Sequence, residues 1–429
     1  MIGDPSACCK ISRLKYCRGE HATHRVPRYR QPSFRTFMKP IIIIGAGMAA
    51  YSLAREVRKL DKTAALLVIT ADDGGFYSKP MLSNAFAQKK LAAQLISQSA
   101  VQMAEQIGAS IMTKTRVKGI DTAAKVVDTS SGAFEYAQLV IAVGAQPIRL
   151  NIAGDAADRV LSVNHIEDYA TFRAKLLPDQ QATARVAILG AGLIGCEFAD
   201  DLAAHGHTVT LIDPNSLPLA ALAAPALSQG LQAALTARGI GLQLGTAAAS
   251  IDRADGAIKL TLSNGETVIA DVVLSAVGLR PDLALAQAAK LATGRGIMID
   301  SHGRTSAPDV YALGDCAEYR VDSEGRTSPL PYIAPILTAA RAIAKTLTGE
   351  DTAIDLKHSP VIVKTPSYPL ALVPPPSHAV AAGRWETEVD GATTVCRFFD
   401  AQGVMVGFGV APQEAKIRQA LMAALGTTA

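Results

Sequence analysis

Ile41-Ile42-Ile43-Ile44-Gly45-Ala46-Gly47-Met48-Ala49-Ala50 is a run of isoleucines that leads directly into a glycine-rich loop. The isoleucines predict a buried strand, and residues 51–57 place apolar side chains at helical spacing. In such a unit the first glycine permits a tight turn, the second lets the backbone approach a pyrophosphate, and the third position must be small. The positive end of the helix then faces the phosphates. The stretch therefore predicts a dinucleotide-binding unit.

The same pattern returns 145 residues later, where residues 186–189 run into Gly190-Ala191-Gly192-Leu193-Ile194-Gly195. One further segment follows each loop, residues 142–147 after the first and residues 276–281 after the second, and these two segments also match each other. One glycine motif is weak evidence, but its repetition between matched strands and helices makes chance a poor explanation. The sequence predicts an α/β protein with two Rossmann-like domains.

Acidic residues follow the second strand of each unit. Asp213 ends the strand 209–212, and a carboxylate there accepts hydrogen bonds from a ribose 2′-hydroxyl and repels a 2′-phosphate. This favours NADH over NADPH. Asp72, after the strand expected at 65–70, should do the equivalent work in the first unit; the alternative is a solvated turn residue.

Three further charged residues suggest chemistry at a flavin. The strand at 309–313 delivers Asp315 into a loop, where it would hold ribityl hydroxyls, and a helix expected to end at Leu347 opens around Pro335. The positive end of that helix would stabilise the charge of a reduced flavin. Lys79 and Lys364 are cations in apolar segments and would do the same, unless they are surface lysines.

These residues resemble those of the two-dinucleotide-domain flavoprotein reductases of the glutathione reductase structural family, over residues 39 to about 350. Four segments, 77–83, 190–198, 314–317 and 363–366, look like those of the rubredoxin-reducing branch, which serves bacterial alkane oxidation. The resemblance implies FAD in the first site, NADH in the second and rubredoxin as electron acceptor.

The resemblance also implies site residues. Those implied for FAD are Gly45, Ala46, Gly47, Met48, Thr70, Ala71, Lys79, Val117, Asp315, Ile333 and Lys364. Those implied for the nicotinamide nucleotide are Gly190, Gly192, Leu193, Ile194, Gly195, Glu197 and Asp213. Further cofactor-binding candidates are Ala49, Asp72, Ala142, Gly144 and Gly278. Lys79, Glu197 and Lys364 are the candidates for a catalytic role. Glu197, expected on the first turn of its helix, has a simple N-terminal charge as its alternative.

Cysteine positions separate the subclasses. No cysteine lies between residues 18 and 195, so the paired cysteines that disulfide reductases need beside the flavin are missing. Cys196 and Cys316 are expected to be packing residues. Electrons must then pass from the flavin to an acceptor outside the chain, which suits a one-electron iron protein. The missing cysteine also argues against an NADH oxidase or peroxidase.

Two alternatives stay open. A reductase of a [2Fe–2S] ferredoxin in an oxygenase chain would share the architecture and the missing cysteines. A flavoprotein in which NADH binding serves as a signal, as in the branch of apoptosis-inducing factor, would be reduced slowly.

Composition sets the domain plan. The chain has 429 residues, 49% of them apolar, and no uninterrupted apolar run long enough to span a bilayer. Cysteine usage favours a reducing, cytoplasmic location, and the scattered histidines predict no metal site. We expect a monomer or weak dimer without a nucleic-acid partner. The expected parts are a disordered basic extension (1–37), an FAD domain (38–150 and 280–352) interrupted by an NAD domain (151–279), and a small α+β domain (353–429).

Residues 1–37 carry eight basic and two acidic side chains. Met38 stands directly before the first strand, where a trimmed chain of this kind would begin.

Overall fold

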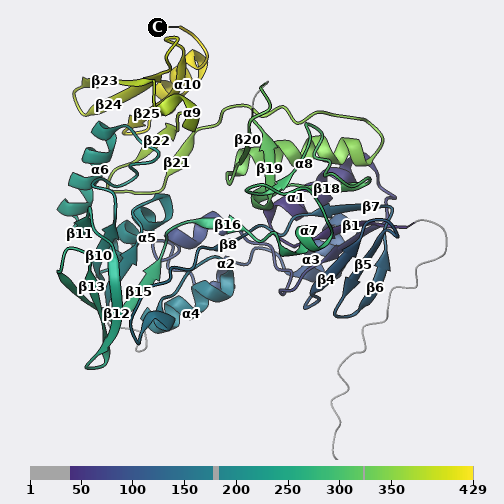
Figure 1. The fold of residues 1–429 in the computed structure, drawn as a ribbon, viewed down its shortest axis with the longest axis horizontal. Coiled ribbons are helices and arrows are strands. Elements are labelled where there is room, and N and C mark those ends of the chain that lie inside the picture. The colour runs from purple at the N-terminus through teal and green to yellow at the C-terminus, as the bar shows by residue number, and fades with distance from the viewer. Residues whose placement is uncertain (1–38, 177–182, 322–323, 429) are drawn as a thin grey trace, which may run out of the picture. The chain divides into compact units, whose positions relative to one another are not determined.

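The computed structural model describes residues 39–176, 183–321 and 324–428. The expected disorder of residues 1–37 therefore lies outside the described residues, as does Met38. Residues 39 onward form the mixed α/β fold that the sequence predicts, with several separate sheets (Figure 1).

The first glycine unit is built around β1 (Ile41–Ile44), α1 (Met48–Leu60) and β2 (Leu66–Ile69). Its sheet is parallel, in the order β18-β7-β1-β2-β3, with β7 at Gln138–Ile141, β3 at Ser110–Met112 and β18 at Val310–Ala312. The buried isoleucines of β1 lie at its centre, and α1 packs against α8 (Ile333–Leu347). Strand β18, far along the chain, therefore completes the sheet of the first unit (Figure 1).

The second glycine unit repeats this plan. It contains β9 (Arg185–Leu189), α5 (Leu193–Ala204), β10 (Thr208–Asp213) and α6 (Pro225–Ala237). The sheet order is β11-β10-β9-β15, with β11 at Gly241–Leu244 and β15 at Val272–Ser275. In both units the central strand is followed directly by the glycine loop.

The two matching segments after the glycine motifs pair with each other. β8 (Ala145–Pro147) and β16 (Leu279–Pro281) form an antiparallel two-stranded ribbon in which Gln146 lies opposite Arg280. The two matching segments thus pair at the place where the chain enters and leaves the second unit.

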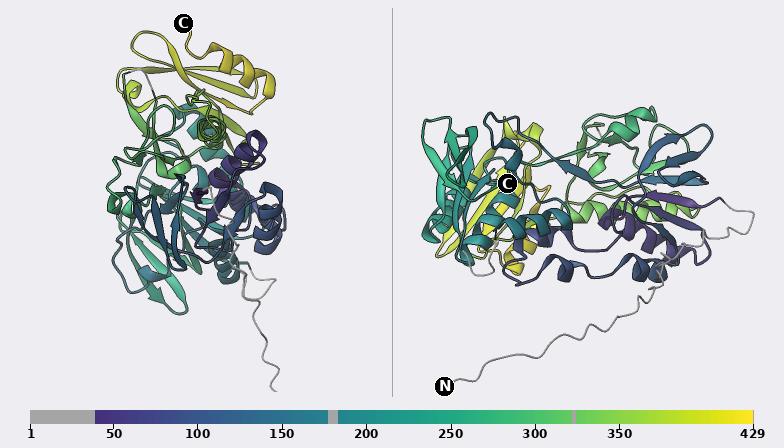
Figure 2. Two further views of the ribbon diagram at one scale, coloured as in Figure 1. Left: turned by 90° about the vertical axis from the view of Figure 1, so that its right-hand side faces the viewer. Right: turned by 90° about the horizontal axis from the view of Figure 1, so that it is seen from below.

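The C-terminal part is a five-stranded antiparallel sheet in the order β21-β22-β25-β24-β23. Its elements are β21 (Val361–Val363), β22 (Leu370–Val373), β23 (Arg384–Asp390), β24 (Thr393–Phe399), β25 (Met405–Ala411) and α10 (Ala415–Ala424). The sequence predicts strands at 361–363, 393–399 and 403–410 and a helix at 413–425. The first two strands are confirmed, and the third strand and the helix form with ends shifted by one or two residues. Helix α6 packs against β24 and β25, and the yellow strands lie beside the teal second unit (Figure 2).

Smaller elements complete the fold. The helical ones are η1 (Lys79–Asn84), α2 (Ala92–Leu95), α3 (Ala100–Ile107), η2 (Ala157–Arg159), α4 (Ile166–Leu176), α7 (Ala284–Ala288), η3 (Gly314–Cys316) and α9 (Ser377–Val380). The strands are β4 (Val117–Asp121), β5 (Val126–Thr129), β6 (Gly132–Glu135), β12 (Ala248–Ala254), β13 (Ala257–Leu262), β14 (Thr267–Ala270), β17 (Ile297–Met298), β19 (Ala317–Arg320) and β20 (Thr327–Pro329). Across the described ranges, we find no helix with the length and apolar character of a membrane span.

Candidate functional site

The glycines of the two loops have the conformations that a nucleotide loop needs. Gly45 and Gly190 have φ angles of +113° and +103°, where side chains are strained. A Cβ on Gly190 would lie 2.7 Å from the carbonyl oxygen of Ala276. Gly47 and Gly192, by contrast, have open space where a Cβ would stand. Both loops therefore leave room at a helix N-terminus for a pyrophosphate, as FAD and a nicotinamide nucleotide require.

Asp213 ends β10 and supports the second loop. One of its carboxylate oxygens accepts a hydrogen bond from the Ala191 backbone N–H at 2.6 Å. The other accepts from the backbone N–H and the side-chain amide of Asn215, both at 2.8 Å. The predicted acid is thus at the strand end, where it is buried beside the glycine loop.

The predicted equivalence of Asp72 and Asp213 is wrong. The N–H of Gly45 bonds to the carbonyl of Ile69, and the N–H of Gly190 bonds to that of Ile212, so the counterpart of Asp213 is Thr70. Asp72 lies two residues further on, because β2 ends before it. Its carboxylate accepts from the Thr70 hydroxyl (2.6 Å) and the Gly74 N–H (2.8 Å), in an exposed turn.

Lys79 and Asp315 interact electrostatically in the first unit. Burial lowers the pKa of Lys79, and the charges of Asp315 and Asp168 oppose this shift. Burial likewise raises the pKa of Asp315, which Lys79 lowers. Within residues 39–176, 183–321 and 324–428, no hydrogen bond from the protein reaches the Asp315 carboxylate. An acceptor that is partly buried and has no protein donor fits the hydroxyls of a flavin side chain.

The loop that carries Asp315 is held close to α1. Gly314 has a φ of +81°, and a Cβ there would lie 2.8 Å from Cβ of Ala49. Its N–H donates to the Tyr319 hydroxyl at 2.7 Å. The loop is therefore fixed through its backbone while the Asp315 side chain stays available.

Glu197 lies at a junction of three segments. It is 2% exposed, and Ser83 Oγ donates to its Oε2 at 2.5 Å. Lys364 forms an ion pair with the same oxygen and donates its backbone N–H to Oε1 at 3.0 Å. The Asn84 side-chain amide donates to the Lys364 carbonyl at 3.0 Å. Helix α5, η1 and the end of β21 thus meet at this carboxylate.

This geometry corrects one expectation. Helix α5 begins at Leu193 and has no acidic residue in its first turn, so Glu197 lies in the second turn. The simple N-terminal charge is therefore excluded as its role. The surface-lysine alternative also fails for Lys364, because its ammonium pairs with a buried carboxylate.

The other predicted residues occupy the ends of elements. Ile194 on the first turn of α5 and Ile333 at the start of α8 are each 43% exposed. Val117 begins β4, Ala71 is exposed after β2, and Ala142 and Gly144 follow β7. Gly278 has a φ of +107° just before β16. Met48 and Leu193 are the first residues of α1 and α5. Ala46 lies in the loop before α1, and Gly195 lies in the first turn of α5.

Residues 39–341 match the family described as pyridine nucleotide-disulphide oxidoreductase. The chain belongs to this family. Residues 353–425 match a rubredoxin binding C-terminal domain. The expected resemblance is thereby confirmed.

Two relatives match most of the chain. A rubredoxin-NAD(+) reductase of Alcanivorax borkumensis is 39% identical over 385 residues, 90% of this chain and 98% of the relative. A nitric oxide reductase FlRd-NAD(+) reductase of Aeromonas salmonicida is 43% identical over 335 residues, 78% and 83% of the two chains. The crystal structure of the covalent putidaredoxin reductase-putidaredoxin complex has the same fold, with a TM-score of 0.81, 23% identity and coverage of 91% and 94%.

The family is named for disulfide chemistry, but the cysteines that lie within the described ranges are buried and unpaired. Cys196, Cys316 and Cys396 are buried and free. Burial raises the pKa of Cys316 to about 11 and that of Cys196 still further. A buried neutral thiol is a packing group, as the sequence predicted. Among the described residues, no cluster of His, Cys, Asp and Glu is arranged for a metal ion.

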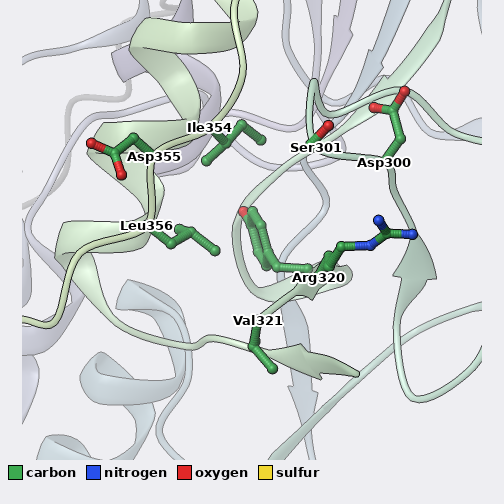
Figure 3. Close-up of a pocket in the computed structure, with 8 residues that line it drawn as sticks. Asp300, Ser301, Arg320, Val321, Ile354, Asp355 and Leu356 are labelled. Atoms are coloured by element: carbon green, nitrogen blue, oxygen red, sulfur yellow. The ribbon is translucent and has the colours of Figure 1, made fainter. Parts of the chain in front are cut away.

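The structure contains a cavity of about 250 Å³, whose lining is shown in Figure 3. Its lining consists of Asp300, Ser301, Tyr319, Arg320, Val321, Ile354, Asp355 and Leu356. None of the predicted cofactor residues contributes to this lining, although Tyr319 also accepts the hydrogen bond from the Gly314 N–H beside Asp315.

Sequence reasoning missed three polar residues at the junction. Ser83 and Asn84 belong to η1, whose first residue Lys79 was singled out, and Asp201 follows Glu197 by one helical turn. A buried acid repeated at i and i+4 on a helix was the available signal, because such acids share one face.

Proposed function

We propose that this protein is an FAD-containing NADH:rubredoxin oxidoreductase. The observation that carries the proposal is a domain that matches a rubredoxin-binding domain and is joined, through Lys364, to the Glu197 carboxylate of helix α5. When bound, FAD would accept a hydride from NADH and pass two single electrons to rubredoxin. The named relative from Alcanivorax supports this assignment.

The residues of the chain would then act through placement and charge. Gly45, Gly47, Lys79 and Asp315 would hold FAD, and Gly192, Ile194 and Asp213 would hold the nicotinamide nucleotide. The Lys79 ammonium would stabilise the negative charge of the reduced cofactor. Glu197 and Lys364 would fix the meeting point of the two sites. The other predicted residues, apart from Asp72, are proposed to line the same two nucleotides.

The domain division and cellular setting are part of the same proposal. The five-stranded sheet that combines β1 with β18 supports an FAD domain at 38–150 and 280–352, and the sheet of β9 to β11 with β15 supports an NAD domain at 151–279. We further propose a cytoplasmic reductase, monomeric or weakly dimeric, that supplies electrons to an alkane hydroxylase system.

Two other acceptors deserve direct comparison. A relative at 43% identity is named a nitric oxide reductase FlRd-NAD(+) reductase, which favours FlRd as a second candidate acceptor. A [2Fe–2S] ferredoxin is the alternative left open by the sequence.

The test is NADH oxidation by the FAD-loaded protein with rubredoxin, FlRd, a [2Fe–2S] ferredoxin and oxygen as acceptors in one buffer. We expect turnover with rubredoxin to exceed that with the ferredoxin or oxygen by more than about tenfold. Equal or faster turnover with the ferredoxin would move the protein to an oxygenase chain. Faster turnover with FlRd would assign it to nitric oxide reduction.

A further inference from the structure

Asp201 is a buried carboxylate that holds a neighbouring segment by its backbone. It is 3% exposed. Its Oδ2 accepts from the Phe86 N–H at 3.0 Å, and its Oδ1 accepts from the Ala87 N–H at 2.8 Å. Both donors stand just after η1, the segment that begins with Lys79. A buried charge is costly unless donors satisfy it, and here the donors belong to the Lys79 segment.

The side chain of Phe86 strengthens this attachment. Its ring packs edge-on against Tyr169 and His207, with centroids 5.9 and 6.0 Å apart. The Arg173 guanidinium carbon lies 4.8 Å from the centre of the same ring. Such contacts add to the stability that burial gives. The segment after η1 is therefore anchored by backbone and side chain together.

Helix α5 accepts hydrogen bonds from residues 83–87 at two points. Glu197 accepts from Ser83, and Asp201, one turn later on the same face, accepts from Phe86 and Ala87. The N-terminus of α5 is the glycine loop proposed to bind the nicotinamide nucleotide. One helix thus connects that loop with the short helix that carries Lys79.

We propose that Asp201 is a positioning residue for hydride transfer: by holding residues 79–87 on the nucleotide-binding helix, it fixes the Lys79 ammonium relative to the nicotinamide site. This inference rests on the proposed function. Because a displacement of about 1 Å can cost about 10²-fold in rate, a loosened segment should act on the chemistry although Asp201 touches neither cofactor.

The test compares Asp201→Asn with Asp200→Asn. The asparagine at 201 keeps the shape but turns an NH₂ group toward one of the two amides. Asp200 is the matched control, because it lies on the same helix and is buried, but accepts from the Ser367 N–H and pairs with Arg238 instead. Stopped-flow measurement of FAD reduction by NADH, without any acceptor, separates this test from the identity of the acceptor.

Two readouts distinguish positioning from general damage. Hydrogen–deuterium exchange of the holoprotein should rise in the peptide 79–90 of Asp201→Asn and stay unchanged in β9 and β10. The midpoint potential of bound FAD should fall, and this fall should vanish when Lys79→Gln is already present, because Asp201 acts through Lys79.

The expected result is a limiting rate of FAD reduction at least about tenfold below wild type in Asp201→Asn, with the potential of Asp200→Asn unchanged. Wild-type rate and potential in a folded Asp201→Asn protein would overturn the inference, as would an equal shift in the Lys79→Gln background. If Asp201→Asn does not fold, Phe86→Leu loosens the same segment and takes its place with the same criteria. Failure of NADH to reduce the wild-type FAD would instead refute the proposed function.

Discussion

Lys79 carries a charge that its surroundings oppose. Burial lowers its pKa, so the ammonium is present at low pH and is lost at a lower pH than for an ordinary lysine. The charges of Asp315 and Asp168 delay this loss without abolishing it. The charge proposed to stabilise the reduced cofactor is therefore sensitive to alkaline conditions.

We expect the rate of FAD reduction by NADH to fall as the pH rises toward the ordinary pKa of a lysine, because Lys79 loses its proton at a lower pH than an ordinary lysine does. Lys79→Gln should be slower at pH 7 by about tenfold and should lack this alkaline fall. Stopped-flow rates across the pH range check both expectations. An identical alkaline fall in Lys79→Gln would show that another group titrates.

Asp213 is predicted to select NADH. Its oxygens support the Ala191 N–H and Asn215, so the carboxylate both shapes the loop and repels a 2′-phosphate. We expect wild-type kcat/KM for NADH to exceed that for NADPH by well over tenfold, a discrimination of at least about 1.4 kcal/mol, and Asp213→Asn to lose most of this ratio. Asp255→Asn, in an exposed turn with a φ of +43°, is the control that should keep it. Equal use of both nucleotides by the wild type would overturn the assignment.

The site residues that could be predicted from the sequence are those that a local pattern defines. Gly45, Gly190 and Asp213 are recognisable because a strand, a loop and a helix follow one another within about 30 residues. The pairing of Glu197 with Lys364 was not predictable, since these residues stand 167 positions apart and only the tertiary fold brings them together. The misplacement of Asp72 came from the end of β2, because strand boundaries are the least certain feature of a sequence.

At the scale of elements, different glycines of the second glycine loop serve folding and ligand binding. Gly195 lies against the carbonyl of Gly190, so a methyl group there collides with backbone, whereas Gly192 faces open space. The same motif thus contains one glycine that the fold needs and one that the ligand needs.

We expect Gly192→Ala to keep the wild-type melting temperature but to raise the KM for NADH by tenfold or more, because the methyl group occupies the approach of the pyrophosphate. Gly195→Ala should instead lower stability, by about 1–3 kcal/mol, because the loop must move. Thermal melting and NADH titration of both variants provide the check. A destabilised Gly192→Ala with normal KM would reverse the two roles.

Helices and strands were predictable to within a few residues, but their grouping was less so. The strand at 361–363 and the start of α8 follow from apolar runs and proline positions. The docking of the C-terminal sheet on α6 was not visible in the sequence. It depends on Gly230, which faces Tyr368, and on Gly409, which faces Leu227; neither pair is local.

At the scale of the molecule, the C-terminal module is continuous with the second glycine unit. Val363, Leu370 and Leu372 belong to the same apolar core as Leu227 and Leu231 of α6. A partner that docks on the C-terminal module therefore contacts a body that also contains helix α5. Lys364 lies where the C-terminal module and α5 meet η1.

Charge is distributed unevenly over this body. Residues 38–150 and 280–352 contain 21 basic and 17 acidic side chains, residues 151–279 contain 7 and 13, and residues 353–429 contain six of each. Rubredoxins are small acidic proteins, so the excess of positive charge in the proposed FAD domain should attract them and the acidic second unit should repel them. Docking is thus expected to be oriented by charge rather than by the neutral C-terminal module alone.

We expect electron transfer to rubredoxin to slow as salt rises from about 20 to 500 mM, because the Debye length then shrinks well below the distances over which the two charge fields attract. The measurement is steady-state rubredoxin reduction at subsaturating acceptor across this range. FAD reduction by NADH in the same buffers is the control, since it involves no protein partner and should change far less. A flat response of rubredoxin reduction would contradict charge-directed docking, and the rubredoxin surface would then have to be recognised by apolar contacts such as those of the exposed Ile362 on β21.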